Sequence, residues 1–341
     1  MSLHPVVVPP TDSLAADTEG NLSSGPSPTV HLLGLGKVGR AFLREISGTG
    51  IRLVGASDST ATVVDREGLD PLALCAHKER GGSLAAWPRA ERVQLELAFG
   101  LLGADVVVDA LPTDLGRAAA AVQRCKAALR AGSALVLASK DALARAGEVL
   151  LAPGTRVGCH AVLGGTGRRL RAELAELRAG CTAIAIAANA STTALVQHLE
   201  RGASLAAAIR DVQALGLLES DPTLDLDGSD AATKLAIVAR AVLDLCCDPR
   251  AVPRADIRGL DPALVRERAA RGSTTRLVGR ADRRGELRVA FEEVPLTSPL
   301  AVPSDRVAYT YTLSAGVRVH VGCGVGPIET ARALLIDVGA S

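Results

Sequence analysis

The pattern of apolar and polar positions differs between the two halves of the chain. The first half shows short, nearly continuous apolar runs. These runs lie at residues 29–33, 51–56, 105–111 and 134–138, and they are typical of parallel strands covered on both faces. Helical stretches follow the first run, at residues 40–46, and separate the last two, at residues 115–130. Strand, helix and strand in this order indicate right-handed crossover connections. The pattern therefore predicts an α/β fold with a Rossmann-type, doubly wound parallel sheet.

The second half follows another pattern. Residues 181–187 alternate, with Ile184 and Ile186 on one face, which is typical of a sheet with one covered side. Further elements are predicted as helices at about 192–200, 204–215 and 230–246, two pairs of strands near 274–294 and 306–321, and a last helix at about 327–338. We therefore expect an α+β region built on a mixed sheet with helices on one face.

These patterns divide the chain into three parts. Residues 1–28, rich in Pro, Ser, Thr and Asp, are predicted to be a disordered tail. Residues 29–158 are the predicted dinucleotide-binding domain, which the C-terminal helix at 323–341 joins. Residues 159–322 are the predicted substrate-binding and dimerisation domain.

The composition narrows the class of partner. Lys and Arg total 38 against 37 Asp and Glu, so no basic excess attracts nucleic acid or a membrane surface. Aromatic residues make up only 2% of the chain, too few for a base-stacking surface. The seven Cys form no CxxC pair, and the N-terminus lacks the basic and apolar regions of a secretory signal. We expect a cytoplasmic protein that acts on a small molecule.

A glycine-rich segment follows the first predicted strand and opens the first helix. Its pattern is Gly34-x-Gly36-x-x-Gly39, in which the glycines permit a tight turn, close approach of a pyrophosphate, and close packing of the helix on the sheet. The N-terminus of the helix adds N–H donors. An ordinary glycine turn is the alternative, but the position between strand and helix favours a cofactor site that also includes Lys37 and Val38.

The residues after the second predicted strand bear on the choice between NAD and NADP. Asp58 lies 19 residues after Gly39, where an acidic residue holds the ribose 2′-OH of NAD and repels the 2′-phosphate of NADP. Lys37, Arg40 and Lys78 would favour NADP instead. The pattern favours NAD and leaves NADP open.

An acidic segment in the second half ends in a single lysine. Five carboxylates lie within residues 219–230, and Ser229 or Gly228 can cap the helix that follows. Asp230 then lies in the first turn, with Lys234 at i+4 on the same face. This is either an exposed ion pair or a site in which acids hold an ammonium group and a lysine handles a proton.

Four motifs resemble those of the homoserine dehydrogenase family. Residues 216–234 match its segment G-x-x-E-x-D-P-x-x-D-x-x-G-x-D-x-x-x-K at every fixed position. Residues 138–143 are similar to its xNKxxL, residues 189–193 to its NGTTN, and residues 322–326 to its GxGAG. The resemblance covers about residues 29–338 and implies reversible, NAD(P)-dependent reduction of aspartate 4-semialdehyde to homoserine by an enzyme that is usually a homodimer.

The resemblance also implies roles for individual residues. Lys234 and Lys140 would be the acid/base pair beside the carbonyl, and Asp230 would orient Lys234 and contact the substrate. Glu219 would bind the substrate ammonium, with Asp225 and Ser191 as weaker candidates. Cofactor contacts would come from Thr113, Lys140 and Gly324. These residue types suit the chemistry, because hydride transfer to an aldehyde leaves an alkoxide that needs a proton or a cation beside it.

Two residues depart from the family pattern. His160 stands where the family has a carboxylate associated with a monovalent cation, and a neutral imidazole is a poor ligand for a hard cation. Ala190 replaces the Gly of NGTTN. These changes place the cation site and the substrate in doubt, and we expect no other metal site.

Three other functions are compatible with this fold. One is a family member acting on a different amino-acid semialdehyde or hydroxy-amino acid in specialised metabolism. Another is a non-catalytic nucleotide-binding protein, against which the joint presence of Lys234, Lys140, Asp230 and Glu219 argues. An aspartate-semialdehyde dehydrogenase would need a Cys nucleophile paired with a His, and adjacent Cys159 and His160 would point to opposite faces of a strand.

Overall fold

The structure, a computed structural model, describes residues 27–88, 91–218, 223–323 and 326–340. The chain divides into two compact units, which are described separately below. One holds the described residues of 11–168 and 327–341 and is called the sheet A unit; the other holds those of 169–326 and is called the sheet B unit. Of the predicted tail, only Ser27 and Pro28 fall within the described residues.

Sheet A has seven strands in the order β4-β3-β2-β1-β5-β6-β7. The parallel strands are β1 (Thr29–Leu33), β2 (Arg52–Ser57), β5 (Val106–Asp109), β6 (Ala134–Leu137) and β7 (Val157–Gly158). Two antiparallel strands, β3 (Thr62–Val64) and β4 (Glu91–Val93), extend one edge. The predicted Rossmann-type sheet is confirmed, and β1 has the predicted bounds.

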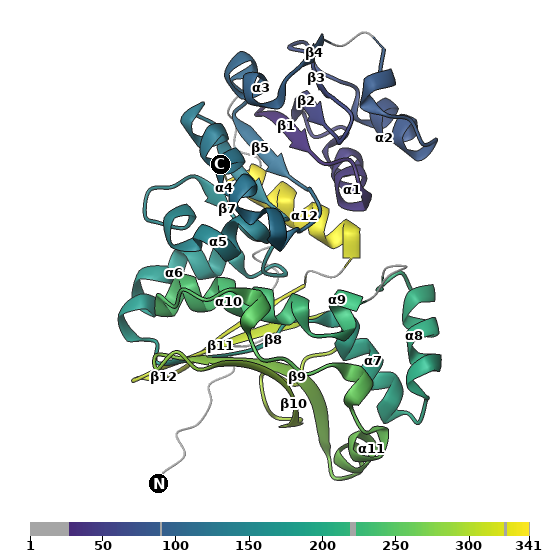
Figure 1. Ribbon diagram of the computed structural model, residues 1–341, viewed down its shortest axis with the longest axis vertical. Coiled ribbons are helices and arrows are strands. Elements are labelled where there is room, and N and C mark those ends of the chain that lie inside the picture. Colours follow the sequence, from purple (N-terminus) through teal and green to yellow (C-terminus); the bar gives the residue numbers. More distant parts are fainter. Residues whose placement is uncertain (1–26, 89–90, 219–222, 324–325, 341) are drawn as a thin grey trace. The chain divides into compact units, whose positions relative to one another are not determined.

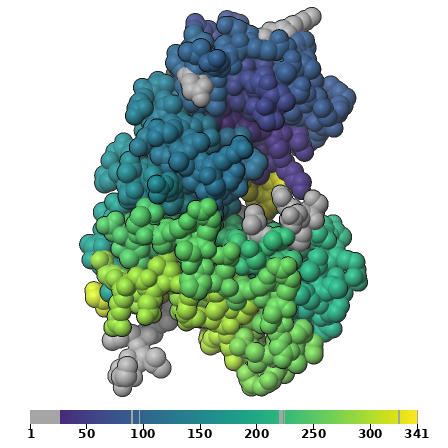
Figure 2. All heavy atoms as spheres, in the orientation of Figure 1, coloured from purple at the N-terminus to yellow at the C-terminus, as the bar shows by residue number. Residues whose placement is uncertain are grey.

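Helices accompany this sheet as expected for crossover connections (Figure 1). They are α1 (Lys37–Ile46), α2 (Pro71–Glu79), α3 (Leu95–Leu102), α4 (Ala118–Arg130), α5 (Asp141–Leu150) and α12 (Gly326–Val338), with short 3₁₀ turns η2 (Leu84–Ala86) and η3 (Leu115–Arg117). The C-terminal helix packs into the core around β1, where Ala331 and Leu334 are fully buried with Val30. In Figure 2 its yellow atoms lie next to the purple atoms of the first strands and helix. The last element therefore completes the core that the first element begins.

Sheet B has five strands in the order β10-β9-β8-β11-β12. They are β8 (Ala183–Ala187), β9 (Ser273–Asp282), β10 (Leu287–Pro295), β11 (Val307–Leu313) and β12 (Gly316–Gly322), and all neighbouring pairs are antiparallel. The expectation of a mixed sheet here was wrong. Short turns join β9 to β10 and β11 to β12, and such hairpins impose antiparallel pairing. The mixed sheet is sheet A.

The helices of the sheet B unit are α6 (Gly167–Gly180), α7 (Ala190–Glu200), α8 (Leu205–Ala214), α9 (Thr223–Leu226), α10 (Ser229–Leu243) and α11 (Pro262–Ala270), with 3₁₀ turns η4 (Pro249–Ala251) and η5 (Ile257–Gly259). Helix α10 lies against the sheet (Figure 1), and a Cβ on Gly279 of β9 would be 3.4 Å from the Leu235 side chain of α10. The predicted helix at 230–246 ends earlier, because Asp244 adopts a left-handed conformation with φ 58°. Within the described residues, no helix combines the length and apolarity needed to cross a membrane.

Candidate functional site

The glycine turn after β1 is tight at two positions and open at the third. The N–H of Gly34 donates to the carbonyl of Ser57 over 2.9 Å, which ties the turn to the end of β2. A Cβ on Gly34 would lie 2.6 Å from the Ala110 carbonyl oxygen, and one on Gly39 would lie 2.0 Å from the Gly34 carbonyl oxygen. Neither position can carry a side chain without moving backbone, whereas a Cβ on Gly36 would meet no atom within 4 Å.

The start of α1 presents backbone donors at this open position. Gly36 is the N-cap residue and forms no side-chain cap, and the first turn contains no acidic residue. The first N–H groups of a helix have no partner inside the helix, so an anion at Gly36 would satisfy them and interact favourably with the helix dipole. Predicted residues Gly34, Gly36, Lys37, Val38 and Gly39 thus form a turn whose shape and donors fit a dinucleotide pyrophosphate.

Asp58 follows β2 directly beside this turn and is bonded on both oxygens. Its Oδ1 accepts from the N–H (2.7 Å) and hydroxyl (2.5 Å) of Thr60 and from the N–H of Ala61 (3.1 Å). Its Oδ2 accepts from Lys78 Nζ over 2.7 Å and from the N–H of Leu84 over 3.2 Å. The carboxylate therefore joins the turn after β2 to α2 and η2.

These contacts keep the Asp58 carboxylate ionised. Partial burial raises the pKa of Asp58, but the hydrogen bonds from Lys78, Thr60 and the Leu84 backbone outweigh burial and hold this pKa well below its ordinary value. A ribose hydroxyl would have to share or replace one of the present donors. The sequence placed Asp58 at the end of the second strand, but it did not reveal that the acceptor positions of this carboxylate are already in use.

Two further predicted residues meet where β5 and β6 end. The Lys140 N–H donates to Thr113 Oγ1 over 3.1 Å, and the Asp114 N–H donates to Asp141 Oδ2 over 3.4 Å. Asp141, only 3% exposed, begins α5 directly after Lys140. The two bonds connect the loop after β5 to the loop after β6, at the carboxyl edge where doubly wound sheets bind ligands.

In the sheet B unit, Lys234 is held by two oxygens. Its Nζ lies 2.9 Å from Asp230 Oδ2, one helical turn earlier in α10, and donates to the Ala188 carbonyl over 2.7 Å. The Lys234 side chain is 13% exposed and that of Asp230 20%. Helix α10 begins after Gly228, whose φ of 76° and close Ala255 carbonyl oxygen, 2.9 Å from a Cβ, require glycine. The predicted i,i+4 pair is present and partly buried, not an exposed surface pair.

Asp225 and Ser191 lie close to each other in the same unit. Ser191 Oγ is 2.7 Å from Asn189 Oδ1 and 2.9 Å from Asp225 Oδ1, and Thr192 Oγ1 donates to the Asp225 carbonyl over 3.0 Å. These bonds connect the start of α7 to α9. Since Ala188 binds Lys234 and precedes Asn189, the predicted residues Lys234, Asp230, Asp225 and Ser191 form one connected polar cluster.

Asn189 is a member of this cluster to which the sequence assigned no role. Its Oδ1 accepts from the N–H of Thr192 over 2.9 Å and caps α7. The cap fixes the orientation of the amide, and Nδ2 has no hydrogen-bond partner among the described residues although Asn189 is only 4% exposed. A buried donor left without an acceptor costs about 1–3 kcal/mol. Asn189 therefore carries a buried donor that none of the described residues satisfies.

Three other predicted residues are Glu219, Gly324 and Lys140. Glu219 and Gly324 lie outside the described residues. Lys140 belongs to the sheet A unit and Lys234 to the sheet B unit, so their convergence on one substrate stays a prediction.

His160 lies two residues after the end of β7, within the sheet A unit. Its N–H donates to Asp337 Oδ2 over 2.8 Å, and its Nδ1 accepts from the N–H of Arg168 over 3.4 Å. The residue is 5% exposed. Among the described residues, no cluster of three or more His, Cys, Asp and Glu could hold a metal ion. Through these contacts His160 links the loop after β7 to α12 and to the start of α6.

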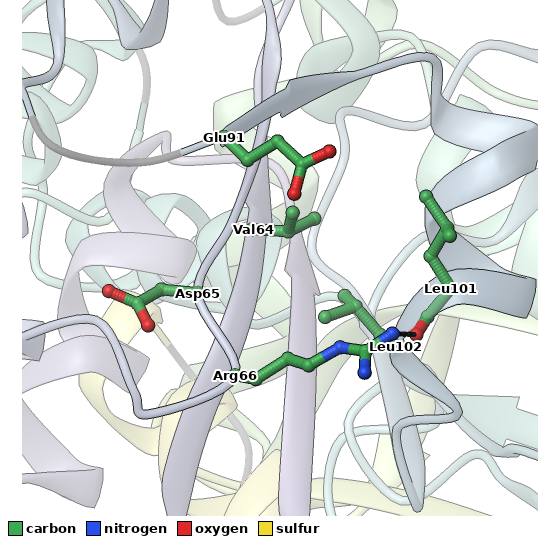
Figure 3. A pocket seen from close by; sticks show the side chains of 6 residues that line it. All are labelled: Val64, Asp65, Arg66, Glu91, Leu101 and Leu102. Atoms are coloured by element: carbon green, nitrogen blue, oxygen red, sulfur yellow. Dashed lines mark hydrogen bonds between the residues drawn. The ribbon is translucent and has the colours of Figure 1, made fainter.

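One pocket of the sheet A unit is separate from the glycine turn (Figure 3). It is lined by Val64, Asp65, Arg66, Glu91, Leu101 and Leu102. Val64 pairs with Gly55, and the Asp65 N–H donates to the Val54 carbonyl, so this pocket faces the beginning of β2, whereas the glycine turn adjoins its end. Across the pocket, the Arg66 guanidinium donates a hydrogen bond to the Leu101 carbonyl over 2.9 Å. The pocket is therefore not part of the predicted cofactor site.

Comparisons with known proteins match each half of the chain to a family of dehydrogenases. The family model for homoserine dehydrogenase matches residues 172–338, and a model for glutamate/leucine/phenylalanine/valine dehydrogenases matches residues 15–152. A homoserine dehydrogenase of Methanocaldococcus jannaschii is 29% identical over 84% of this chain and 88% of its own length. An NAD(+)-dependent homoserine dehydrogenase of Pseudomonas canavaninivorans is 28% identical over 90% of this chain and 94% of its own.

A solved structure shares the fold. It is a hyperthermophilic archaeal homoserine dehydrogenase in complex with NADPH, with a TM-score of 0.70 and 22% sequence identity, over 92% of this chain and 96% of that chain.

Proposed function

The chain belongs to the homoserine dehydrogenase family, an enzyme family of NAD(P)-dependent oxidoreductases acting on a CH–OH group, and we propose that it interconverts L-homoserine and aspartate 4-semialdehyde. The observation that carries the proposal is the partly buried Lys234 ammonium, held by Asp230 and the Ala188 carbonyl beside a polar cluster. This arrangement provides a positioned proton donor in the region that matches the family.

Lys234 is the proposed acid and base at the reacting oxygen. A bound nicotinamide cofactor would supply or accept the hydride at the carbon that carries this oxygen. In the direction of reduction, the Lys234 ammonium gives a proton to the developing alkoxide; in the direction of oxidation, the amine removes the hydroxyl proton. Asp230 Oδ2 lies 2.9 Å from Lys234 Nζ and fixes its position. Lys140 is proposed as the second lysine of the pair.

The substrate amino acid needs groups for its ammonium and carboxylate. We assign the ammonium to Glu219, with Asp225 and Asp230 nearby in the acidic segment, and a hydrogen bond to Ser191, whose hydroxyl already lies 2.9 Å from Asp225. Fixing the substrate at several points converts the hydride transfer into an effectively unimolecular step, which supplies much of the rate enhancement.

Cofactor binding is assigned to the sheet A unit. The donors at the start of α1 would hold the pyrophosphate at Gly36, and Thr113 and Lys140 would contact the nicotinamide half. Gly324, which belongs to the other unit, is a further cofactor contact that only the family resemblance implies. The hydrogen bond between the Lys140 N–H and Thr113 Oγ1 supports a shared role for these two residues.

The test is the formation of NADH or NADPH by the purified protein with L-homoserine at alkaline pH. We expect steady turnover in the wild type and its loss in Lys234→Ala. A wild-type protein that turns over homoserine while Lys234→Ala does so equally well would end the assignment of this lysine.

A second candidate is oxidation of a different hydroxy-amino acid. Ala190, at the first position of α7 beside Asn189, adds a methyl group where the family motif has Gly. A smaller pocket would favour another side-chain length. Turnover of a related hydroxy-amino acid, without turnover of L-homoserine, would support this function instead.

We also propose a homodimer formed through sheet B, as the family resemblance implies. Residues 184–187 of β8 are all buried within the single chain, so the proposal rests on the family resemblance alone. Light scattering coupled to size-exclusion chromatography would decide it, and a monomer at micromolar concentration would contradict the proposal.

A further inference from the structure

Asp58 and Lys78 form a carboxylate–ammonium pair beside the glycine turn. The hydrogen bond from the Gly34 N–H to the Ser57 carbonyl brings the end of β2 to the turn, and Asp58 is the next residue. In doubly wound folds, this is where the ribose of the adenosine half lies. Whatever charge this pair presents therefore faces either the 2′-hydroxyl of NAD or the 2′-phosphate of NADP.

Asp58 offers little acceptor capacity to a ribose. A carboxylate has about four lone-pair positions, and Asp58 already accepts from five donors on Thr60, Ala61, Lys78 and Leu84. Apart from Lys78, these donors belong to the loop after β2 and to η2, so replacing them with a ribose hydroxyl would disturb both segments. Asp58 therefore has a structural role, in which it holds the loop after β2, α2 and η2 together.

Lys78 changes the charge that a cofactor meets. It lies in the last turn of α2, its side chain is 16% exposed, and one of its three donor positions points at Asp58 over 2.7 Å. The pair as a whole is neutral. A 2′-phosphate, with a charge of about −1.5 to −2, would therefore meet an ammonium fixed in place instead of an uncompensated carboxylate.

We propose that Lys78, held in place by Asp58, determines specificity at the adenosine ribose and allows NADP to bind as well as NAD. This inference rests on the proposed function, since it takes the glycine turn to be the cofactor site. Asp58 is then the residue that positions Lys78, not the residue that excludes NADP.

Calorimetric titration of the full-length protein with NAD⁺ and NADP⁺, and with ADP and 2′,5′-ADP as fragments, tests the proposal. In Lys78→Ala, the dissociation constants of NADP⁺ and 2′,5′-ADP should rise about tenfold to hundredfold, the range for loss of a charge-assisted hydrogen bond. Those of NAD⁺ and ADP should change by less than about threefold. Lys78→Arg keeps the cation and should retain NADP⁺ binding, which also guards against a folding defect in the alanine variant.

Arg80→Ala is the matched control. Arg80 is exposed, follows α2 two residues after Lys78, and makes no contact with Asp58. The Arg80→Ala substitution removes one positive charge from the same helix end and should leave the ratio of the NADP⁺ and NAD⁺ dissociation constants unchanged. An equal loss of both dinucleotides in Lys78→Ala, or the same shift in Arg80→Ala, overturns the inference. If the wild-type protein binds neither dinucleotide, the proposed function itself is contradicted. If the wild type oxidises homoserine but Lys78→Ala leaves the dissociation constants of both dinucleotides unchanged, only the role of Lys78 is contradicted.

Discussion

Each unit of the molecule contains a partly buried lysine paired with an aspartate, and the two pairs have nearly the same geometry. Lys78 Nζ lies 2.7 Å from Asp58 in the sheet A unit, and Lys234 Nζ lies 2.9 Å from Asp230 in the sheet B unit. The lysine side chains are 16% and 13% exposed. Distance and burial alone do not distinguish them.

The surroundings of the two pairs differ. Asp58 accepts from the backbone of two loops, so its pair is part of the local scaffold. Lys234 reaches a carbonyl next to Asn189, whose buried Nδ2 has no acceptor among the described residues. A carboxylate that accepts from several loop donors stabilises structure and, with its lysine, presents a fixed charge, whereas we propose that the pair beside the Asn189 amide contacts a ligand.

Replacing Lys234 should distinguish the two lysine–aspartate pairs most clearly. Lys234→Ala is expected to lower kcat/KM for homoserine about 10³- to 10⁴-fold, because it removes the proposed proton donor. Steady-state assays at saturating NAD(P)⁺ measure this. Lys126→Ala, on α4 and outside both pairs, is the control and should keep wild-type kinetics. Retained activity in Lys234→Ala would mean that the two pairs do not differ in the way proposed.

Acid should destabilise the sheet A unit through the buried His31. Buried His31 binds Ser57 Oγ over 2.9 Å, directly before Asp58, and desolvation by burial lowers the pKa of His31 to about 4. The unfolded chain binds this proton near pH 6.5, so the free energy of unfolding should fall between pH 6.5 and about 4, by about 3 kcal/mol, and then level off.

Denaturant titrations followed by fluorescence of Trp87, the one Trp of the chain, report on this unit. His31→Gln, which cannot take up the proton, should flatten the dependence on pH. An unchanged pH dependence in His31→Gln would assign the acid sensitivity to other groups.

Asp230→Asn should separate catalysis from stability. Loss of the carboxylate that positions Lys234 is expected to lower kcat about 10- to 100-fold, whereas i,i+4 ion pairs on helix surfaces contribute only about 0.3–0.5 kcal/mol to stability and the asparagine amide can still accept from Lys234. Kinetics and thermal unfolding of the same preparation measure both. A large fall in Tm with little change in kcat would make Asp230 a structural residue like Asp58.

Asn189 allows the smallest and most specific test. Asn189→Ser keeps a cap acceptor for α7 but removes the amide donor, so we expect kcat/KM for homoserine to fall about tenfold with little change in Tm. Asn189→Ala also removes the cap and should cost about 1 kcal/mol of stability. Wild-type kinetics in Asn189→Ser would show that Nδ2 has no ligand.

Local sequence rules were sufficient where the structure depends on near neighbours. The apolar runs predicted β1, β2, β5 and β6 to within two residues, because a strand covered on both faces has no polar positions. Helical geometry alone brought Asp230 and Lys234 together, since residues at i and i+4 share a face. Gly34 and Gly39 were identified because only glycine fits where backbone approaches so closely.

Tertiary structure decided what depends on segments far apart in the sequence. The donors that occupy Asp58 come from Lys78 and Leu84, on elements whose docking onto β2 no local pattern specifies. The unpartnered amide nitrogen of Asn189 results from a cap that fixes its oxygen and from packing that buries its nitrogen. The antiparallel order of sheet B follows from which strands the hairpins bring together. Residue type and spacing determine which groups are present, but only the fold determines which of their hydrogen-bonding positions are already satisfied, because that count depends on every element packed around them.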